Sequence, residues 1–88
     1  MDLQECRAQI DQIDKQIVEL FLRRMEIVVG VAAYKKENNK PVYDPVREQA
    51  KLDALRAQVP EQMQEYIVRL YETMFAVSRD YEHELLGD

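Results

Sequence analysis

The sequence predicts an all-α domain with one long helix and two shorter ones, paired with a second copy as an intertwined homodimer that forms a six-helix bundle. Three observations predict this fold class. Apolar residues recur every three or four positions through three segments, which is the period of a helix. No segment alternates apolar and polar residues as a half-buried strand does. The first segment is also too long for an 88-residue chain to cover alone.

The first helix is expected from Leu3 to Asn39, because its apolar period runs unbroken and no proline interrupts it. At 1.5 Å per residue it would be about 55 Å long, which exceeds the diameter of a compact domain of this size. An apolar face that one chain cannot bury predicts a partner, most simply a second copy. The residues on that face are Ile10, Ile13, Ile17, Leu20, Phe21, Ile27, Val28 and Val31.

Two cations lie within this apolar face. Arg24 falls between Leu20 and Val28, and Lys35 follows Val31 by four residues. Eleven residues at about 100° each place Arg24 and Lys35 within about 20° of one another around the helix. Cations are rarely buried without a partner, so three arrangements of these two side chains are open. They reach the surface, they pair with acids of another helix, or they form a cationic pocket for an anionic ligand.

Composition restricts the classes of function. The chain suits a single helical domain, residues 1–88, and its formal net charge of −5 argues against nucleic acid or an anionic membrane surface as a partner. The longest apolar run, from Ile27 to Tyr34, is far shorter than the roughly 20 residues of a membrane span. The N-terminus does not resemble a signal peptide, so we expect a cytoplasmic protein. Cys6 and His83 each stand alone, which predicts neither a disulfide within the chain nor a metal site.

The second helix is expected from Pro45 to Gln58. Residues 38–41 end the first helix, because asparagine tolerates the left-handed cap conformation and proline cannot continue a helix. Asp44 is placed to cap the new helix, and Pro45 suits its first position, where a missing N–H costs nothing. Arg47 lies in the first turn, where the helix dipole favours an acid, so it has either a binding role or a salt bridge to a nearby acid. The expected packing residues are Val46, Ala50, Leu52, Ala54 and Leu55.

A third helix is expected to follow the boundary at residues 59–61 and to run to Leu85. Ser78 lies beside its apolar face, and Glu82 follows four residues later, so the two share one side of the helix. These polar side chains either face a common site or are exposed to solvent in the last turns. The expected apolar face consists of Met63, Tyr66, Ile67, Leu70, Met74, Val77, Tyr81 and Leu85.

Taken together, these features resemble the all-helical chorismate mutases over nearly the whole chain. The resemblance implies conversion of chorismate to prephenate, in the biosynthesis of phenylalanine and tyrosine, without a cofactor or a metal. It also implies an intertwined homodimer with two sites. Arg7 and Arg24 lie about 25 Å apart along the first helix, so we expect Arg7 to reach each site from across the interface. The specific parts of the match are Arg7-x-x-Ile10-x-x-Ile13-Asp14, the pair Arg23-Arg24, Lys35, the run Pro41-Val42-x-Asp44-x-x-Arg47-Glu48, and Ser78 with Glu82.

The resemblance implies that three cations bind the charged groups of the substrate. Arg7 and Arg24 would hold the two carboxylates, and Lys35 would reach a carboxylate and the ether oxygen. A pericyclic [3,3] rearrangement needs no nucleophile; it needs a dianion held in its reactive chair and positive charge where the C–O bond breaks. Guanidinium groups suit the first task, and a compact ammonium suits the second.

The polar residues of the second and third helices complete the implied site. Glu48, with the backbone near Asp44, would hold the ring hydroxyl, and Arg47 and Ser78 would line or brace the pocket. Glu82 would be the second donor to the ether oxygen, a catalytic role like those of Arg24 and Lys35. The best-known family pattern has glutamine at this position. Because an ionised carboxylate has no proton to donate, Glu82 would have to act as a protonated acid.

Two other functions compete with this interpretation. An isochorismate pyruvate lyase on the same scaffold would share most of the cations, but Asp44 and Glu48 are suited to the ring hydroxyl and favour the mutase. A non-catalytic dimerisation or regulatory module would keep the helical bundle alone. Such a module has no reason to place Arg24 and Lys35 on its core face.

Overall fold

The computed structural model describes residues 1–87 and consists of three α-helices. The first, α1, spans Leu3–Glu37, α2 spans Pro45–Arg56, and α3 spans Gln64–Leu86 after a short 3₁₀ turn, η1, at Glu61–Met63. No strand occurs within these residues, so the predicted all-α class with one long and two shorter helices is confirmed. The first two helices each end two residues earlier than expected, and the 3₁₀ turn delays the start of the third.

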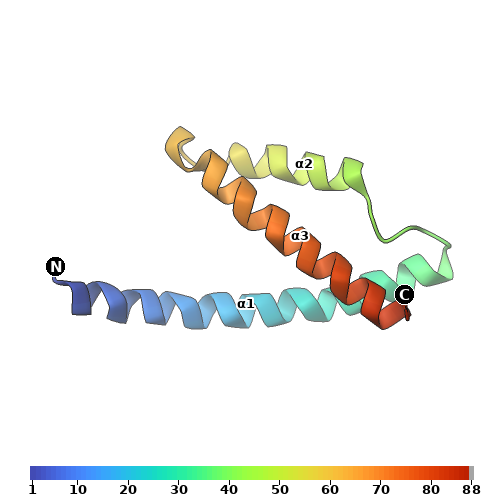
Figure 1. The fold of residues 1–88 in the computed structure, drawn as a ribbon, viewed down its shortest axis with the longest axis horizontal. Coiled ribbons are helices and arrows are strands. Elements are labelled where there is room, and N and C mark those ends of the chain that lie inside the picture. The colour runs from blue at the N-terminus through green and yellow to red at the C-terminus, as the bar shows by residue number, and fades with distance from the viewer. Residues whose placement is uncertain (88) are drawn as a thin grey trace.

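The three helices are arranged around α3, which packs against both of the others. Figure 1 shows α3 crossing the C-terminal half of α1, with α2 on its other side, while the N-terminal half of α1 projects away from both. The molecule measures 53 × 26 × 16 Å, and its radius of gyration is 16.1 Å. A compact domain of this length would have a radius of gyration of about 12 Å. The chain is therefore markedly extended.

Local hydrogen bonds and backbone conformation set the limits of α1 and the start of α2. Asp2 caps α1, because its Oδ1 accepts from the amide of Glu5 at 2.8 Å. After α1, Asn39 takes a left-handed conformation with φ 53°, which asparagine tolerates better than most residues. Asp44 Oδ1 then accepts from the amide of Arg47 at 3.0 Å and caps α2. This cap fixes the direction in which the first turn of α2 leaves the loop.

The core of the single chain is small. Leu52 of α2 packs against Val68 and Phe75 of α3, with Tyr71 contacting Phe75 edge-to-face at 6.0 Å between ring centroids. α1 contributes two buried residues, Val28 and Ala32, both from its C-terminal half. The core therefore lies where the C-terminal half of α1 approaches α3 and between α2 and α3.

The predicted apolar faces of the shorter helices are only partly the buried ones. Tyr66 and Leu70 of α3 are 62% and 54% exposed, whereas Val68 and Phe75, which lie outside the expected face, are buried. The helix is apolar on two sides, and periodicity alone does not say which side the rest of the chain covers. In α2, Val46 is 79% exposed although it was expected to pack, because it lies on the outer side of the first turn.

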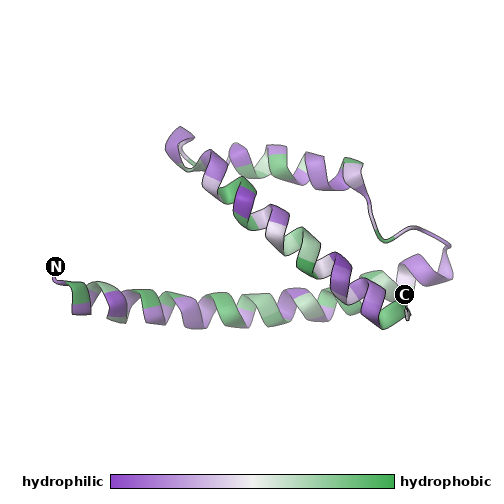
Figure 2. Ribbon diagram, in the orientation of Figure 1, coloured by the Kyte–Doolittle hydropathy of each residue, from purple (hydrophilic) through white to green (hydrophobic). Residues whose placement is uncertain are grey.

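Most of the apolar face of α1 is uncovered in the single chain. Ile13, Ile17 and Leu20 are each more than half exposed, and Figure 2 shows hydrophobic bands along the whole helix, including the half that no other helix approaches. Within residues 1–87, neither α1 nor any other helix is long and apolar enough to cross a membrane. The uncovered face is accordingly the main structural feature that the single chain leaves unexplained.

Candidate active site

A cavity of about 450 Å³ lies between the C-terminal half of α1, the first turns of α2 and the last turns of α3. Its walls are partly apolar, with Val28, Val31 and Phe75 among the lining residues. Within the described part of the chain, the lining also holds five cations and three carboxylates, an excess of two positive charges in a chain whose net charge is −5. The cavity is thus suited to a small anion. These charged residues are Arg24, Lys35, Arg47, Lys51 and Arg79, with Asp44, Glu48 and Glu82.

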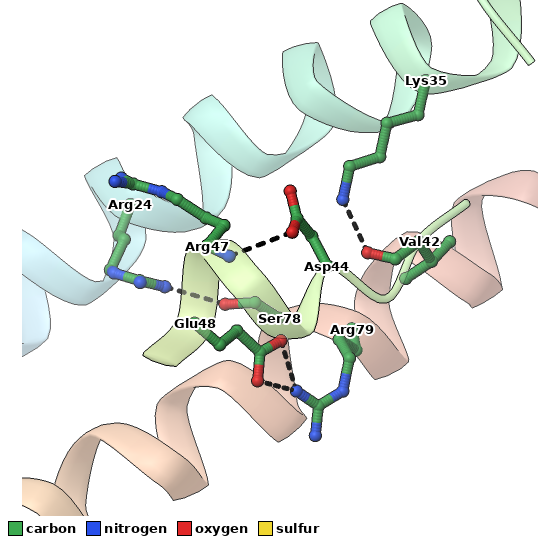
Figure 3. Close-up of polar contacts among 8 residues, drawn as sticks. All are labelled: Arg24, Lys35, Val42, Asp44, Arg47, Glu48, Ser78 and Arg79. Carbon is green, nitrogen blue, oxygen red and sulfur yellow. Dashed lines mark hydrogen bonds and ion pairs between the residues drawn. The ribbon is translucent and has the colours of Figure 1, made fainter. Parts of the chain in front are cut away.

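Arg24 is held in the cavity wall by α3. Its Nη1 donates to Ser78 Oγ at 2.8 Å, and both residues are half-buried. Figure 3 shows this contact bridging the two helices. A guanidinium has five N–H donors, so one bond to a hydroxyl leaves others to bind a carboxylate. Ser78 therefore orients Arg24 without consuming its binding capacity.

Lys35 pairs with an acid of another helix, which is one of the alternatives that its position in α1 predicted. Its Nζ donates to the carbonyl oxygen of Val42 at 2.7 Å and lies 3.0 Å from Glu82 Oε1. The second contact is an ion pair without hydrogen-bond geometry, because Oε1 accepts no hydrogen bond from residues 1–87. Glu82 is only 5% exposed, so the alternative that it faces solvent is wrong.

Glu48 is held by Arg79, a residue that the sequence analysis did not identify. One terminal nitrogen of Arg79 donates to both carboxylate oxygens of Glu48, as Figure 3 shows. The guanidinium also lies over the ring of Tyr43, 5.1 Å from its centroid. The hydrogen bonds to Glu48 raise the pKa of Arg79 above its ordinary value, so this cation stays charged. A signal was available, since Arg79 shares a side of α3 with Phe75 and Glu82 at helical spacing.

The N-cap and the first turns of α2 contribute three further charged residues to the cavity lining. Asp44 and Arg47 both line the cavity, as predicted, although each is exposed. The side chain of Arg47 extends toward α1 in Figure 3 and makes no ion pair with residues 1–87, so the expected alternative of a salt bridge is not observed. Lys51, one turn after Arg47, also lines the cavity and was not predicted.

Arg7 is the one predicted site residue that the single chain keeps away from the cavity. It is exposed on the projecting half of α1 and does not line the cavity. Seventeen residues separate it from Arg24, which corresponds to about 25 Å along the helix axis. The other seven predicted residues all line the cavity: Arg24, Lys35, Asp44, Arg47, Glu48, Ser78 and Glu82.

Comparison with known proteins identifies the family of this chain. The family model of chorismate mutase type II matches residues 6–83, which is most of the chain. The chain belongs to this family. The all-helical architecture, with no strand within residues 1–87, is consistent with this family. No solved structure matches the chain significantly.

Similar curated proteins come from several organisms. A T-protein of Haemophilus influenzae is 39% identical over 54 residues, which cover 61% of this chain and 14% of that protein. A bifunctional chorismate mutase/prephenate dehydratase of Buchnera aphidicola is 33% identical over 88 residues, covering 98% of this chain and 23% of the relative. A chorismate mutase of Methanocaldococcus jannaschii is 37% identical over 54 residues, which cover 61% of this chain and 54% of that protein. The chain thus spans less than a quarter of the first two relatives.

Proposed function

We propose that this chain catalyses the rearrangement of chorismate to prephenate. The observation that carries the proposal is the cationic cavity, in which Arg24 and Lys35 of the long helix face Glu82 and Ser78 of α3. Chorismate is a dianion, and an excess of two positive charges on the lining matches its charge. Family membership supports the same reaction and favours it over a lyase or a non-catalytic module.

The cavity residues have two tasks in the proposed reaction. They position the substrate, and they stabilise the charge that develops in the transition state. Arg24 binds one carboxylate and holds the substrate in its reactive chair. Lys35 supports a carboxylate and the ether oxygen, where negative charge develops as the C–O bond breaks. Glu82, protonated, is the second donor to that oxygen. Glu48, with the backbone near Asp44, accepts from the ring hydroxyl and fixes which face of the ring is presented.

We further propose that the working unit is an intertwined homodimer, a six-helix bundle in which the partner's Arg7 completes each cavity. The exposed apolar face of α1 and the large radius of gyration support a second copy that packs along this helix. The distance of about 25 Å between Arg7 and Arg24 supports the exchange, because one chain cannot bring both to a small substrate. We expect this dimer to act in the cytoplasm, as the composition predicts.

The direct test mixes the purified chain with chorismate, follows the loss of chorismate absorbance and identifies the product. We expect prephenate in equal amount and no pyruvate. Arg24→Met should lower kcat/KM at least about a hundredfold, because a substrate carboxylate then stays unpaired in a desolvated site. Arg69→Met, which removes an exposed arginine of α3 outside the cavity, is the matched control and should keep the parent's activity.

Any result other than conversion to prephenate contradicts the proposed mutase activity. Pyruvate release would assign the chain to the lyases. Unchanged chorismate, with a folded and dimeric protein, would leave the non-catalytic module as the function.

A further inference from the structure

Arg79 connects three segments that border the cavity. It belongs to α3, it holds both carboxylate oxygens of Glu48 in the first turn of α2, and it lies over Tyr43 of the loop before that helix. Both partners of the ion pair are sheltered, with Arg79 and Glu48 side chains 28% and 22% exposed. A sheltered pair of this kind is screened less by solvent than a surface pair. The contact therefore ties the position of Glu48 to α3.

The pair also forms a wall between two cavities. Glu48 and Arg79 line the cavity of about 450 Å³ and also a second one of about 240 Å³, which Tyr43 and Leu52 border on the other side. A glutamate side chain has several rotatable bonds, so without Arg79 the carboxylate would be able to turn into the second cavity. It would also present an unpaired negative charge to a dianionic substrate. Arg79 opposes both effects.

Glu48 keeps acceptor capacity while Arg79 holds it. An ionised carboxylate has about four lone-pair sites, and the contacts with Arg79 occupy two of them. The remaining sites are available to a hydroxyl donor inside the larger cavity. The guanidinium face of Arg79 is meanwhile covered by Tyr43, which limits its own approach to a ligand.

Resting on the mutase activity proposed above, we propose that Arg79 is a positioning residue that acts through Glu48. It holds the Glu48 carboxylate in the orientation that accepts a hydrogen bond from the ring hydroxyl of chorismate, and so it contributes to selectivity for substrates that carry this hydroxyl. The alternative, in which Arg79 binds a substrate carboxylate directly, predicts a different result in the same experiment.

The experiment compares chorismate with the analogue that carries hydrogen in place of the ring hydroxyl. For the parent enzyme, we expect loss of the hydroxyl to lower kcat/KM roughly ten- to a hundredfold, the usual effect of a hydrogen bond to a charged group. In Arg79→Met, the two substrates should differ by less than about threefold, because only the hydroxyl-bearing substrate loses a contact. Arg56→Met, which removes a partly exposed, ion-paired arginine outside both cavities, is the matched control and should keep the parent's selectivity.

Each outcome decides the proposal. If Arg79→Met lowers kcat/KM equally for both substrates, Arg79 acts on a carboxylate or on the fold, and the positioning role is wrong. If circular dichroism shows that Arg79→Met is unfolded, we use Arg79→Lys for the comparison, since an ammonium keeps the charge but lacks the fixed planar geometry with which the guanidinium orients the Glu48 carboxylate. Unchanged selectivity in the lysine variant would overturn the proposal. A parent enzyme that does not convert chorismate refutes the proposed function instead.

Discussion

At the scale of single residues, Glu82 and Lys35 share a contact that a substrate would have to change. Glu82 is the most deeply buried charged residue of the described chain, and its Oε1 lies 3.0 Å from Lys35 Nζ. If Lys35 turns to a substrate carboxylate, Glu82 loses this cation and faces a dianion in a sheltered site.

This arrangement predicts that activity depends on the proton of Glu82. Only the protonated carboxyl can donate to the ether oxygen, so kcat/KM should be highest at acidic pH and should fall as the carboxyl ionises. Glu82→Gln supplies a permanent amide donor of nearly the same shape. We expect this variant to keep activity, to show a flat profile between about pH 5 and 8, and to exceed the parent near pH 8. Steady-state kinetics across that range measure both profiles.

Two results would contradict the donor role of Glu82. One is a parent enzyme whose kcat/KM is constant over the same pH range. The other is a Glu82→Gln variant that retains the parent's preference for acid, because then another group must titrate.

At the scale of the element, α1 has more apolar surface than its predicted face contains. Val18, Leu22 and Val29 also recur at helical spacing, on a second side of the helix, and are 44% to 56% exposed. A helix that is apolar on two sides is typically buried between several neighbours. In the single chain, α3 covers only the surface near Val28 and Ala32. Both sides of α1 are therefore available to helices of a second copy.

Dimer formation should depend on the apolar face of α1. Ile17→Glu would bury a carboxylate in each half of a symmetric interface, and we expect the dimer dissociation constant to rise at least about a hundredfold. Sedimentation equilibrium measures this constant. The matched control is Gln12→Glu, which adds the same charge on the polar side of the same helix and should leave the dimer intact. A parent chain that is monomeric, or an Ile17→Glu chain that dimerises like the parent, would contradict the proposed bundle.

At the scale of the whole molecule, the distance between Arg7 and the cavity predicts sites shared between two chains. Arg7→Ala and Lys35→Ala should each be nearly inactive alone. When the two variants are unfolded and refolded together, each heterodimer contains one site in which Arg7 and Lys35 are both intact. At equal amounts, about one quarter of all sites should then be functional, and a kinetic assay of the mixture should recover activity in that proportion.

Subunit exchange is the control for this experiment. A tag on one variant, captured with the untagged variant, reports heterodimers independently of activity. Heterodimers without recovered activity would show that each site is built from one chain.

Much of the architecture and of the site followed from the sequence. The length of α1, its stop at the asparagines, and the cap by Asp44 depend on local propensity and on side-chain to backbone hydrogen bonds, which neighbouring residues decide. Arg24 and Lys35 share a face because helix geometry requires it. The same geometry places Ser78 and Glu82 together on α3, and all four line the cavity.

Only the tertiary structure decided which residues of different helices meet. The pairing of Lys35 with Glu82, the capture of Glu48 by Arg79, and the burial of Phe75 in place of Tyr66 depend on how α3 crosses the other helices. Helical periodicity fixes the angle of a residue around its own axis, but it does not fix the rotation of one helix against another. That relative rotation is set by packing of the small core. It makes Arg79 a partner of Glu48 and leaves the N-terminal half of α1 without contact to the other helices.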